Sequence, residues 1–346
     1  MNQMKGAQSV YFNEPVKILS HAGAGGKMEG DGPLGKHLDL IVEDPMFGRE
    51  NWEESESQFL KTAGEIALRK AKKKKEDVRM AFAGDLLGQL IGSSFGIRQM
   101  DIPFYGVYGA CSSVGAALSV GAMAVDGGYA DLALSACSSH FASAEKEFRF
   151  PLGYGSQRPY SATWTVTGAG AFLLNKEKGD TAIRGFTTGK IKDYGVQDPF
   201  NMGASMAPAA ADTIYQALED FGKKPEDFDK IITGDLGTVG QKLLFSLLGD
   251  NHVNISGNHM DCGMEIYNEK KQDIHAGGSG CACSALVLSA MILPKLASGE
   301  WKNVLFVPTG ALLSQVSANE GRTIPAIAHA LWLTKAEPDS QPQKKN

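Results

Sequence analysis

The sequence predicts an α/β fold made of two similar halves, and three observations carry this prediction. A short apolar strand around Tyr105 leads through a turn of small residues at Cys111 into a helix rich in glycine and alanine. Residues 277–291 repeat this order, and both helices contain the pattern Ala-Leu-x-x-x-Ala-Met, starting at Ala117 and at Ala285. The neighbouring strands are continuous apolar runs of the kind that parallel sheets bury on both faces. A repeat on this scale indicates two halves related by a pseudo-two-fold axis.

The elements of the first half follow from apolar periodicity and from the turn residues that bound each run. In chain order we expect strands at 8–12 and 37–42, a helix at 53–75, a strand at 78–85, a strand ending at Gly109, a helix beginning at Cys111 and a strand at 130–137. The helix over 53–75 ends in a basic run, residues 69–75. This run either complements the negative end of the helix dipole or contacts an acidic partner or an anionic membrane surface.

The second half repeats this order after a long connection, residues 138–210, which contains one strand at 162–175. We expect a helix at 211–221, a turn at 223–229, a strand at 230–235, the second strand-to-helix corner at 277–291 and a strand at 303–308. The strand at 230–235 ends in Gly-Asp-Leu-Gly, much as the strand at 78–85 ends in Gly-Asp-Leu-Leu-Gly. We therefore predict an N-terminal half, residues 1–175 with a long loop insertion, and a C-terminal half, residues 176–346.

The composition of the 346-residue chain is that of a globular protein with a large core. Its 34 basic and 39 acidic residues give a formal charge of −5, so nucleic acid is not expected as a partner. Five cysteines without paired spacing indicate a reducing compartment. The N-terminal segment is too polar for a signal peptide, and the longest apolar run, 281–293, is too short to span a bilayer. Any contact with a membrane is therefore expected to be peripheral.

Cys111 is the first candidate for the functional site because it stands where a helix begins. Unpaired backbone N–H groups and the positive end of the helix dipole lower a thiol pKa there and attract anions. The residue is then a nucleophile or the floor of an anion pocket; the alternative is a small side chain chosen for tight packing. In a two-fold arrangement the second corner, near Ser279, would face Cys111 across a site between the halves.

Other side chains qualify for the same site on chemical grounds. Arg149 and Arg158 stand among aromatic and glycine residues and suit a flat anionic ligand, although a dimer interface or a capped loop explains them equally well. His140 either lines the pocket or is a hydrogen-bonded structural residue. His252, His259 and Cys262 have no familiar metal-ligand spacing, so we expect no metal and no cofactor. Cys281 and Cys283 are best explained by helix packing.

The Gly-Ala-Cys111-Ser-Ser corner, the Gly-Gly-Ser279-Gly helix start and the internal repeat together resemble the thiolase-like fold family, over most of residues 55–335. The resemblance implies a layered α-β-α-β-α arrangement and places Cys111 where the family keeps its acyl-accepting thiol. The family's basic or amide partner falls on Asp235, and His275 lies near a Gly-His-Pro motif from which it departs by one residue. With a carboxylate in place of neutral donors, the resemblance implies a site without condensing activity; an acyltransferase that uses Cys111 is the alternative.

Within that fold family the chain is similar to a branch of non-enzymatic sporulation proteins, through the loop Arg-Phe-Pro-Leu-Gly-Tyr-Gly-Ser-Gln-Arg-Pro at 149–159 and its flanks. This likeness implies binding of dipicolinic acid, alone or with Ca²⁺, for uptake into the developing spore. Cys111, His275, Arg158, Arg149, Asp235 and His140 are the candidate ligand-binding residues. The likeness also implies a homodimer that works with membrane subunits at the cytoplasmic face of the spore inner membrane.

Overall fold

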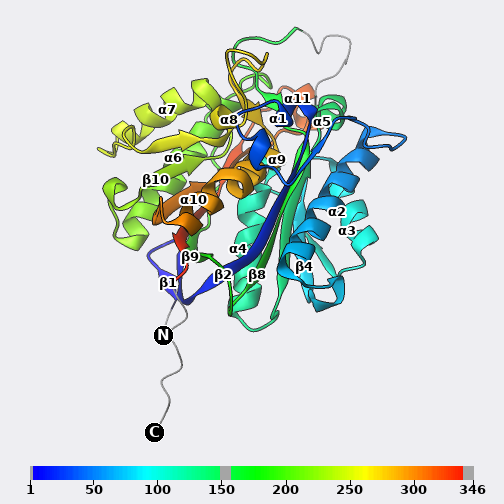
Figure 1. The fold of residues 1–346 in the computed structure, drawn as a ribbon. Coiled ribbons are helices and arrows are strands. Elements are labelled where there is room, and N and C mark those ends of the chain that lie inside the picture. The colour runs from blue at the N-terminus through cyan, green and yellow to red at the C-terminus, as the bar shows by residue number, and fades with distance from the viewer. Residues whose placement is uncertain (1–2, 149–156, 338–346) are drawn as a thin grey trace.

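A computed structural model describes residues 3–148 and 157–337 of the chain (Figure 1). Its strands are β1 (Met4–Lys5), β2 (Ser9–Gly26), β3 (Leu40–Val42), β4 (Met80–Gly84), β5 (Phe104–Gly106), β6 (Ala133–Ser139), β7 (Trp164–Thr165), β8 (Gly168–Asn175), β9 (Thr181–Thr187), β10 (Lys230–Thr233), β11 (His259–Asp261), β12 (Gly278–Ser279), β13 (Asn303–Val307), β14 (Thr309–Ala311), β15 (Ala326–Ala328) and β16 (Ala330–Lys335). Its helices are α1 (Lys27–Gly30), α2 (Trp52–Ala71), α3 (Ile91–Met100), α4 (Ser113–Asp126), α5 (Phe141–Phe148), α6 (Met202–Phe221), α7 (Gly237–Gly249), α8 (Cys262–Glu265), α9 (Cys281–Val287), α10 (Leu293–Ser298) and α11 (Gln315–Asn319).

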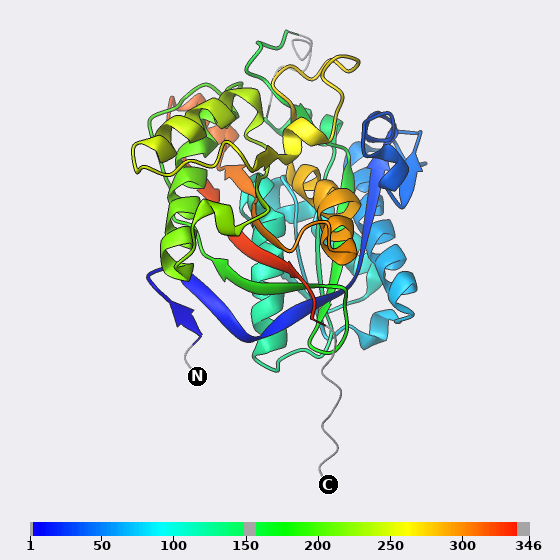
Figure 2. The ribbon, with the colours of Figure 1, turned by 60° about the vertical axis from the view of Figure 1, so that its left-hand side comes forward.

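The main sheet follows the order β11-β10-β13-β16-β9-β2-β8-β6-β4-β5. Its two parts are joined by β2, an 18-residue strand that pairs antiparallel with β9 along its first portion and with β8 along its second. Figure 2 shows β2, in blue, running along the lower edge of the molecule and then up its right-hand side. One strand therefore makes a single sheet path out of the two halves.

The two parts of the sheet repeat the same pairing pattern, which is the structural form of the sequence repeat. In the first, β4 pairs parallel with β5 and β6, and β6 pairs antiparallel with β8. In the second, β10 pairs parallel with β11 and β13, and β13 pairs antiparallel with β16. Even the turns before β4 and β10 match, because Asp77 and Asp227 each accept a hydrogen bond of 2.8 Å from the backbone N–H three residues earlier. The predicted duplication is confirmed.

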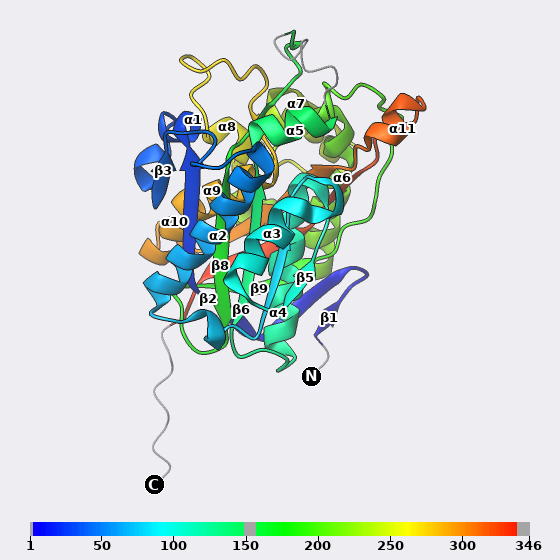
Figure 3. The same cartoon turned by 90° about the vertical axis from the view of Figure 1, so that its right-hand side faces the viewer.

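Helices cover the sheet in layers (Figures 1 and 3). One outer face carries α2 and α3, the opposite outer face carries α6 and α7, and α4 with α9 lies between the two parts of the sheet. Three apolar clusters fill the spaces between these layers, the central one around Leu118 and Leu286 and the outer ones around Phe59 and Ile214. The chain therefore has the α-β-α-β-α layers of a thiolase-like α/β fold, as the sequence predicts.

Several predicted elements have different limits, for local reasons. The helix expected at 53–75 ends at Ala71, because Lys72 adopts the left-handed conformation (φ 54°) that commonly terminates helices. The strand expected at 162–175 is two strands, β7 and β8. The strand expected to end at Gly109 stops at Gly106, and a short 3₁₀ turn, Ala110–Ser112, precedes α4.

The C-terminal elements are longer than expected. The helix expected at 211–221 begins at Met202 and tolerates Pro208 in its interior. The second-corner helix includes a π-helical segment, Leu288–Ile292, and continues past Pro294 to Ser298. Cys281–Ser298 therefore has the length and apolar character of a membrane span. Most of this helix is buried inside the fold, as expected for the core helix of a globular protein.

Candidate binding site between the two halves

The two predicted corners meet at the centre of the molecule. Cys111, at the start of the helical segment that leads into α4, and Ser279, at the end of β12, are both buried, and their Sγ and Oγ atoms are 3.8 Å apart. Since Ser279 Oγ donates its own proton to Asp235, the remaining arrangement is a Cys111 S–H that donates to Ser279 Oγ. The expectation that the corners face a common site is confirmed.

The backbone at the first corner is held in a conformation that few residues adopt. Ala110 has a φ of 49°, and the hydroxyl groups of Ser112 and Ser113 donate to the carbonyl oxygens of Gly109 and Ala110 at 2.6 and 2.7 Å. A non-glycine residue at positive φ carries strain that the surrounding structure must offset. The hydrogen bonds and the packing of Gly310 of β14 against this turn fix the position of the Cys111 sulfur.

The second corner is not free to bind an anion, because the carboxylate of Asp235 already occupies it. Asp235 Oδ2 accepts the backbone N–H of Gly280 at 3.0 Å and the hydroxyl of Ser279 at 2.9 Å, and Oδ1 accepts the hydroxyl of Thr309 at 2.8 Å. Burial raises the pKa of Asp235, and the hydrogen bonds from Thr309, Gly280 and Ser279 at the start of α9 oppose this shift by favouring the carboxylate. The second helix start is therefore occupied by a carboxyl group of the protein itself.

The thiol of Cys111 is kept in its neutral form. Burial raises its pKa well above the usual value, and the nearby Asp235 carboxylate raises it further. The helix start does not offset these two effects, so the expectation of a lowered pKa is wrong. A thiolate is the reactive form of cysteine, and the arrangement disfavours it.

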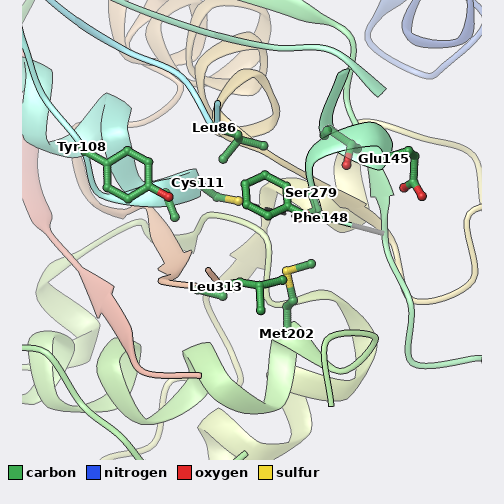
Figure 4. Close-up of a pocket in the computed structure, with 12 residues that line it drawn as sticks. Leu86, Tyr108, Cys111, Glu145, Phe148, Met202, Ser279 and Leu313 are labelled. Carbon is green, nitrogen blue, oxygen red and sulfur yellow. Dashed lines mark hydrogen bonds between the residues drawn. The ribbon is translucent and has the colours of Figure 1, made fainter. Parts of the chain in front are cut away.

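An inner cavity of about 30 Å³ lies beside the Cys111 sulfur (Figure 4). It is lined by Leu86, Tyr108, Ala110, Cys111, Ala144, Glu145, Phe148, Thr165, Met202, Ser279, Ala311 and Leu313, which come from both halves. A space of this size holds about one or two water molecules. The inner cavity is therefore too small for an organic ligand.

An outer cavity of about 420 Å³ adjoins the inner one and shares four lining residues with it, Leu86, Tyr108, Phe148 and Leu313. Its remaining walls are residues 87–90, Glu147 and residues 314–316. The volume lies in the range of small-molecule sites. Glu147 is the one charged residue among the described residues that line it. The part of its lining that the structure describes therefore suits a flat apolar ligand and includes no cation.

Two of the candidate polar residues lie away from both cavities. His275 Nδ1 is 2.8 Å from the carbonyl oxygen of Pro159, and Nε2 is 3.1 Å from the carboxylate of Asp273. His140 is buried, donates from Nε2 to Pro45 O at 2.8 Å and accepts the Ala142 N–H at Nδ1. Burial lowers the pKa of His140, so it is a neutral structural residue, which was the alternative interpretation. The expectation of His275 as a polar pocket wall is also wrong. Its ring contacts the Pro159 carbonyl and the Asp273 carboxylate, and it lines neither cavity.

The two arginines have different outcomes. Arg158 donates to Asp273 Oδ2 at 2.7 Å and lies over the ring of Trp164 at 4.8 Å, outside both cavities. Its buried Nη1 has no hydrogen-bond partner among the described residues, so a donor remains available. Arg149 lies outside the described residues. The expectation that Arg158 reaches the pocket as a carboxylate partner is therefore not met in this structure.

The histidines of the loop after α7 do not form a metal site. His259 is hydrogen-bonded to Thr233 Oγ1 and Gln241 Nε2 at 2.9 and 3.1 Å. Among residues 3–148 and 157–337, no three His, Cys, Asp or Glu side chains are placed to hold a metal ion.

Sequence reasoning missed the aromatic walls, Tyr108 and Phe148. Tyr108 lies three residues before Cys111, so its nearness in sequence was the available signal.

The comparisons with known proteins agree with this architecture. The family model of stage V sporulation protein AD matches residues 6–334. The chain is 41% identical to stage V sporulation protein AD of Bacillus subtilis over 334 residues, which cover 96% of this chain and 98% of the relative.

Solved structures with the same fold are condensing enzymes. One is 3-oxoacyl-(acyl-carrier-protein) synthase III from Aquifex aeolicus, with a TM-score of 0.56, 15% identity, and coverage of 92% of this chain and 99% of that chain. Another is a variant of OleA from Xanthomonas campestris, with a TM-score of 0.60, 14% identity, and coverage of 94% and 99%. At these identities the likeness establishes the fold alone.

Proposed function

The chain belongs to the stage V sporulation protein AD family, and on that premise we propose that it binds dipicolinic acid for uptake into the developing spore without catalysing acyl transfer. The observation that carries this proposal is the outer cavity, a ligand-sized space with aromatic walls that leads to a thiol kept neutral by burial and by Asp235. A vestigial catalytic corner with an adjoining cavity is suited to binding a ligand.

The chemistry of condensation requires groups that this corner lacks. An acyl-accepting thiol must become a thiolate beside a base, and the developing oxyanion must meet hydrogen-bond donors. The buried Asp235 carboxylate, whose bonding partners are Ser279, Gly280 and Thr309, would repel both negative charges. Among the described residues that line the inner cavity there is no histidine, lysine or arginine.

The volume of the outer cavity is sufficient for dipicolinate, and the charge of this ligand suggests its bound form. The planar pyridine ring can lie between the rings of Tyr108 and Phe148, where aromatic contacts add to the burial of apolar surface. The described walls supply Glu147 and no cation, so a free dianion would be repelled. Calcium prefers oxygen ligands, and its two positive charges would cancel those of the dianion, so Glu147 would face a neutral chelate to which it can add an oxygen ligand. We therefore propose that the ligand binds as its calcium chelate.

Titration calorimetry with dipicolinate tests this proposal on the full chain, with and without Ca²⁺. We expect the Tyr108→Ala variant to bind the calcium chelate about tenfold more weakly than the wild type, because it loses an aromatic wall. Tyr129→Ala is the matched control, since Tyr129 is an exposed tyrosine that lines neither cavity. Equal affinity in the wild type and Tyr108→Ala would remove the outer cavity from the proposal.

An acyltransferase is the second candidate, and the position of Cys111 at the family's corner favours it. Incubation with acyl-CoA donors, followed by mass spectrometry of the intact protein, separates the two functions. We expect no stable adduct on Cys111 because its thiol is neutral. A thioester that is absent from the Cys111→Ala variant would establish the acyltransferase.

We also propose that the protein works as a homodimer with the membrane subunits of the stage V sporulation A system, at the cytoplasmic face of the spore inner membrane. The basic segment Lys72–Lys75 is exposed at the end of α2 and suits an acidic or anionic surface. Pull-down of the membrane subunits should fail for Lys72→Glu/Lys73→Glu and persist for the control Lys270→Glu/Lys271→Glu. Equal recovery of both variants would exclude this segment.

A further inference from the structure

Two walls of the outer cavity come from neighbouring parts of the first half. One is the segment that follows β4, residues 86–90, which we call the wall segment, and the other is α5, which supplies Glu147 and Phe148. Leu86 and Phe148, one from each wall, also line the inner cavity beside Cys111 (Figure 4). The separation of these two walls therefore sets the width of the site proposed for the ligand.

The wall segment contains a strained turn. Gln89 and Leu90 follow each other in the left-handed conformation, with φ of 54° and 55°, and neither is a glycine. Such strain persists only where surrounding contacts hold the backbone. Here the contacts come from Asp85, whose Oδ1 accepts the backbone N–H of Leu87 at 2.8 Å and whose Oδ2 accepts that of Ser93 at 2.6 Å. One carboxyl group therefore holds both ends of the turn.

A second carboxyl group, that of Glu56 on α2, holds the other wall. Its Oε2 accepts the hydroxyl of Ser143 on α5 at 2.7 Å, and Oε1 accepts that of Ser138 on β6 at 3.2 Å. The two carboxyl groups meet at Gly92 of α3, where an added Cβ atom would lie 2.9 Å from Glu56 Oε1 and 3.2 Å from Asp85 Cγ. Both acidic residues are fully buried. The two walls are therefore joined through a pair of adjacent buried carboxyl groups.

The surroundings of this pair supply no compensating cation. Neither carboxyl group is paired with a lysine, arginine or histidine among residues 3–148 and 157–337. Glu53, one turn earlier on α2, pairs with Lys146 of α5 at 2.5 Å, and burial lowers the pKa of His140, which precedes α5. Three further groups near the pair stay neutral because burial raises their pKa values: Cys137, Cys281 and Tyr108.

With no cation beside them, the two carboxyl groups share one proton near neutral pH. Burial raises the pKa of Glu56 to about 8, and the adjacent Asp85 contributes in the same direction. Burial also raises the pKa of Asp85. Loss of the shared proton places two negative charges side by side in a buried site, where they repel each other strongly. This repulsion acts on the two groups that hold the strained turn and α5.

We propose that the proton shared by Glu56 and Asp85 holds the two walls together, so that its loss to solvent releases the wall segment and weakens ligand binding. Both are positioning residues, since neither lines the outer cavity. The part of this inference that concerns binding rests on the function proposed above, whereas the release of the wall segment does not. The outer cavity then binds its ligand at neutral pH and releases it as the pH rises through about 8.

Titration calorimetry of the full chain with calcium dipicolinate across a pH series tests the link to binding. We expect the affinity of the wild type to fall about tenfold between about pH 7 and about pH 9, with net proton uptake near the midpoint. The uptake appears as a dependence of the binding enthalpy on the buffer. Glu56→Gln, which cannot ionise, should give a flat affinity profile and no proton uptake. Glu54→Gln, exposed on the same helix, is the matched control and should follow the wild type.

The Ser143→Ala variant separates a shared proton from a merely structural role of α5. The hydroxyl of Ser143 donates to Glu56 and favours its charged form, so its removal should raise the pKa of Glu56. The midpoint of the affinity profile should then move to higher pH. A loosening of α5 alone would weaken binding at every pH and leave the midpoint where it is. An unchanged or lower midpoint would contradict the inference.

Hydrogen exchange of the free protein tests the wall segment without any ligand. The backbone amides of Leu87 and Ser93 should lose protection above about pH 8 in the wild type and keep it in Glu56→Gln. Constant protection in the wild type, parallel profiles in these two proteins, or a flat affinity profile in the wild type would each overturn the inference. If dipicolinate does not bind at all, the proposed function fails, and hydrogen exchange still decides this inference. If Glu56→Gln does not fold, Ser143→Ala takes its place in both measurements.

Discussion

At the scale of single residues, the state of Cys111 depends on one buried carboxylate. Asp235 accepts three hydrogen bonds in the second corner, and its charge raises the pKa of the thiol in addition to the effect of burial. A helix start by itself would favour a thiolate. Burial and the Asp235 carboxylate therefore act together to keep the Cys111 thiol neutral.

We predict that Asp235→Asn makes Cys111 more reactive. The substitution removes the negative charge and keeps an amide of similar size, so the pKa of the thiol should fall. Alkylation by iodoacetamide across a pH series, read by peptide mass spectrometry at Cys111, should shift its midpoint to lower pH. Asp273→Asn, an exposed carboxylate outside the cavities, is the control. An unchanged or higher midpoint in Asp235→Asn would contradict the electrostatic explanation.

Two further carboxyl groups, Glu56 and Asp85, are buried next to each other behind the cavity walls. Glu56 accepts the hydroxyl of Ser143 on α5 at 2.7 Å, and Asp85 accepts the backbone N–H of Leu87 at 2.8 Å. Burial raises the pKa of Glu56 to about 8, and the adjacent Asp85 contributes in the same direction. Glu56 contacts α5, and Asp85 contacts the segment at Leu87, so the pair connects two elements that line the outer cavity. Within this pair Glu56 holds a proton at neutral pH.

This protonation predicts how stability changes with pH. The folded pKa of Glu56, about 8, lies above its ordinary value of 4.5, so the stability that protonation contributes is fully present below about pH 4.5 and is lost as pH rises towards 8. Between these limits the free energy of unfolding should fall by up to about 1.4 kcal/mol per pH unit relative to Glu56→Gln. Urea unfolding at several pH values measures the difference. The control Glu54→Gln, exposed on the same helix, should follow the wild type. Parallel pH profiles for the wild type and Glu56→Gln would refute this assignment.

At the scale of elements, strand β14 determines how tightly the first corner is held. A Cβ atom on Gly310 would lie 2.0 Å from the carbonyl oxygen of Gly109 and 3.2 Å from the backbone nitrogen of Cys111. Both contacts are with backbone atoms, which cannot move aside as a flexible side chain can. Glycine is therefore required at this position by the close approach of two chain segments.

We predict that Gly310→Ala lowers the free energy of unfolding by about 1–3 kcal/mol, the usual cost of overpacking a core. The control is Gly249→Ala at the end of α7, where an added Cβ meets no atom within 4 Å. Denaturant unfolding of both variants gives the comparison. If Gly310→Ala is as stable as Gly249→Ala, the explanation that β14 approaches the corner too closely for a side chain is wrong.

Elements with a strong local signal were predictable from the sequence, and those defined by long-range pairing were not. The corners at Cys111 and Ser279 and the buried strands β6 and β13 were found because small-residue turns and apolar runs are local features. The glycine-rich segment at the end of β2 is extended because Gly23 allows the strand to lie against Leu286 of α9. No local pattern announces such a contact.

At the scale of the whole molecule, the sheet ends at β5, and this edge is the surface we propose for the homodimer. Tyr105 on β5 is 63% exposed, and Phe95 on the adjacent α3 is 47% exposed. An exposed edge strand with apolar neighbours is a template for pairing with a second chain. A two-fold arrangement of two β5 strands would bury both side chains.

We predict that Tyr105→Asp converts the dimer into a monomer, because it places a charge in the centre of this interface. Analytical ultracentrifugation over a concentration series measures the change. Tyr160→Asp, which changes a tyrosine exposed elsewhere, should leave the assembly intact. A dimer that survives Tyr105→Asp would move the interface away from β5.

The candidate site was predicted in its location and only in part in its composition. Cys111, Ser279 and Asp235 come together because the repeat brings its two corners to one centre, and a repeat is visible in sequence. Arg158 is a candidate for its chemistry and His275 for its place near a Gly-His-Pro motif, and the loops that carry them turn both side chains towards Asp273. Side-chain direction in loops depends on contacts far along the chain, so residue type alone could not assign it. The division into halves at residue 175 stays a prediction.

A crystal structure of the protein with bound calcium dipicolinate tests the central claim most directly. We expect the pyridine ring between Tyr108 and Phe148 in the outer cavity, with the Cys111 sulfur unmodified. A ligand seated elsewhere in the protein, or an outer cavity that stays empty at saturating ligand, would contradict it.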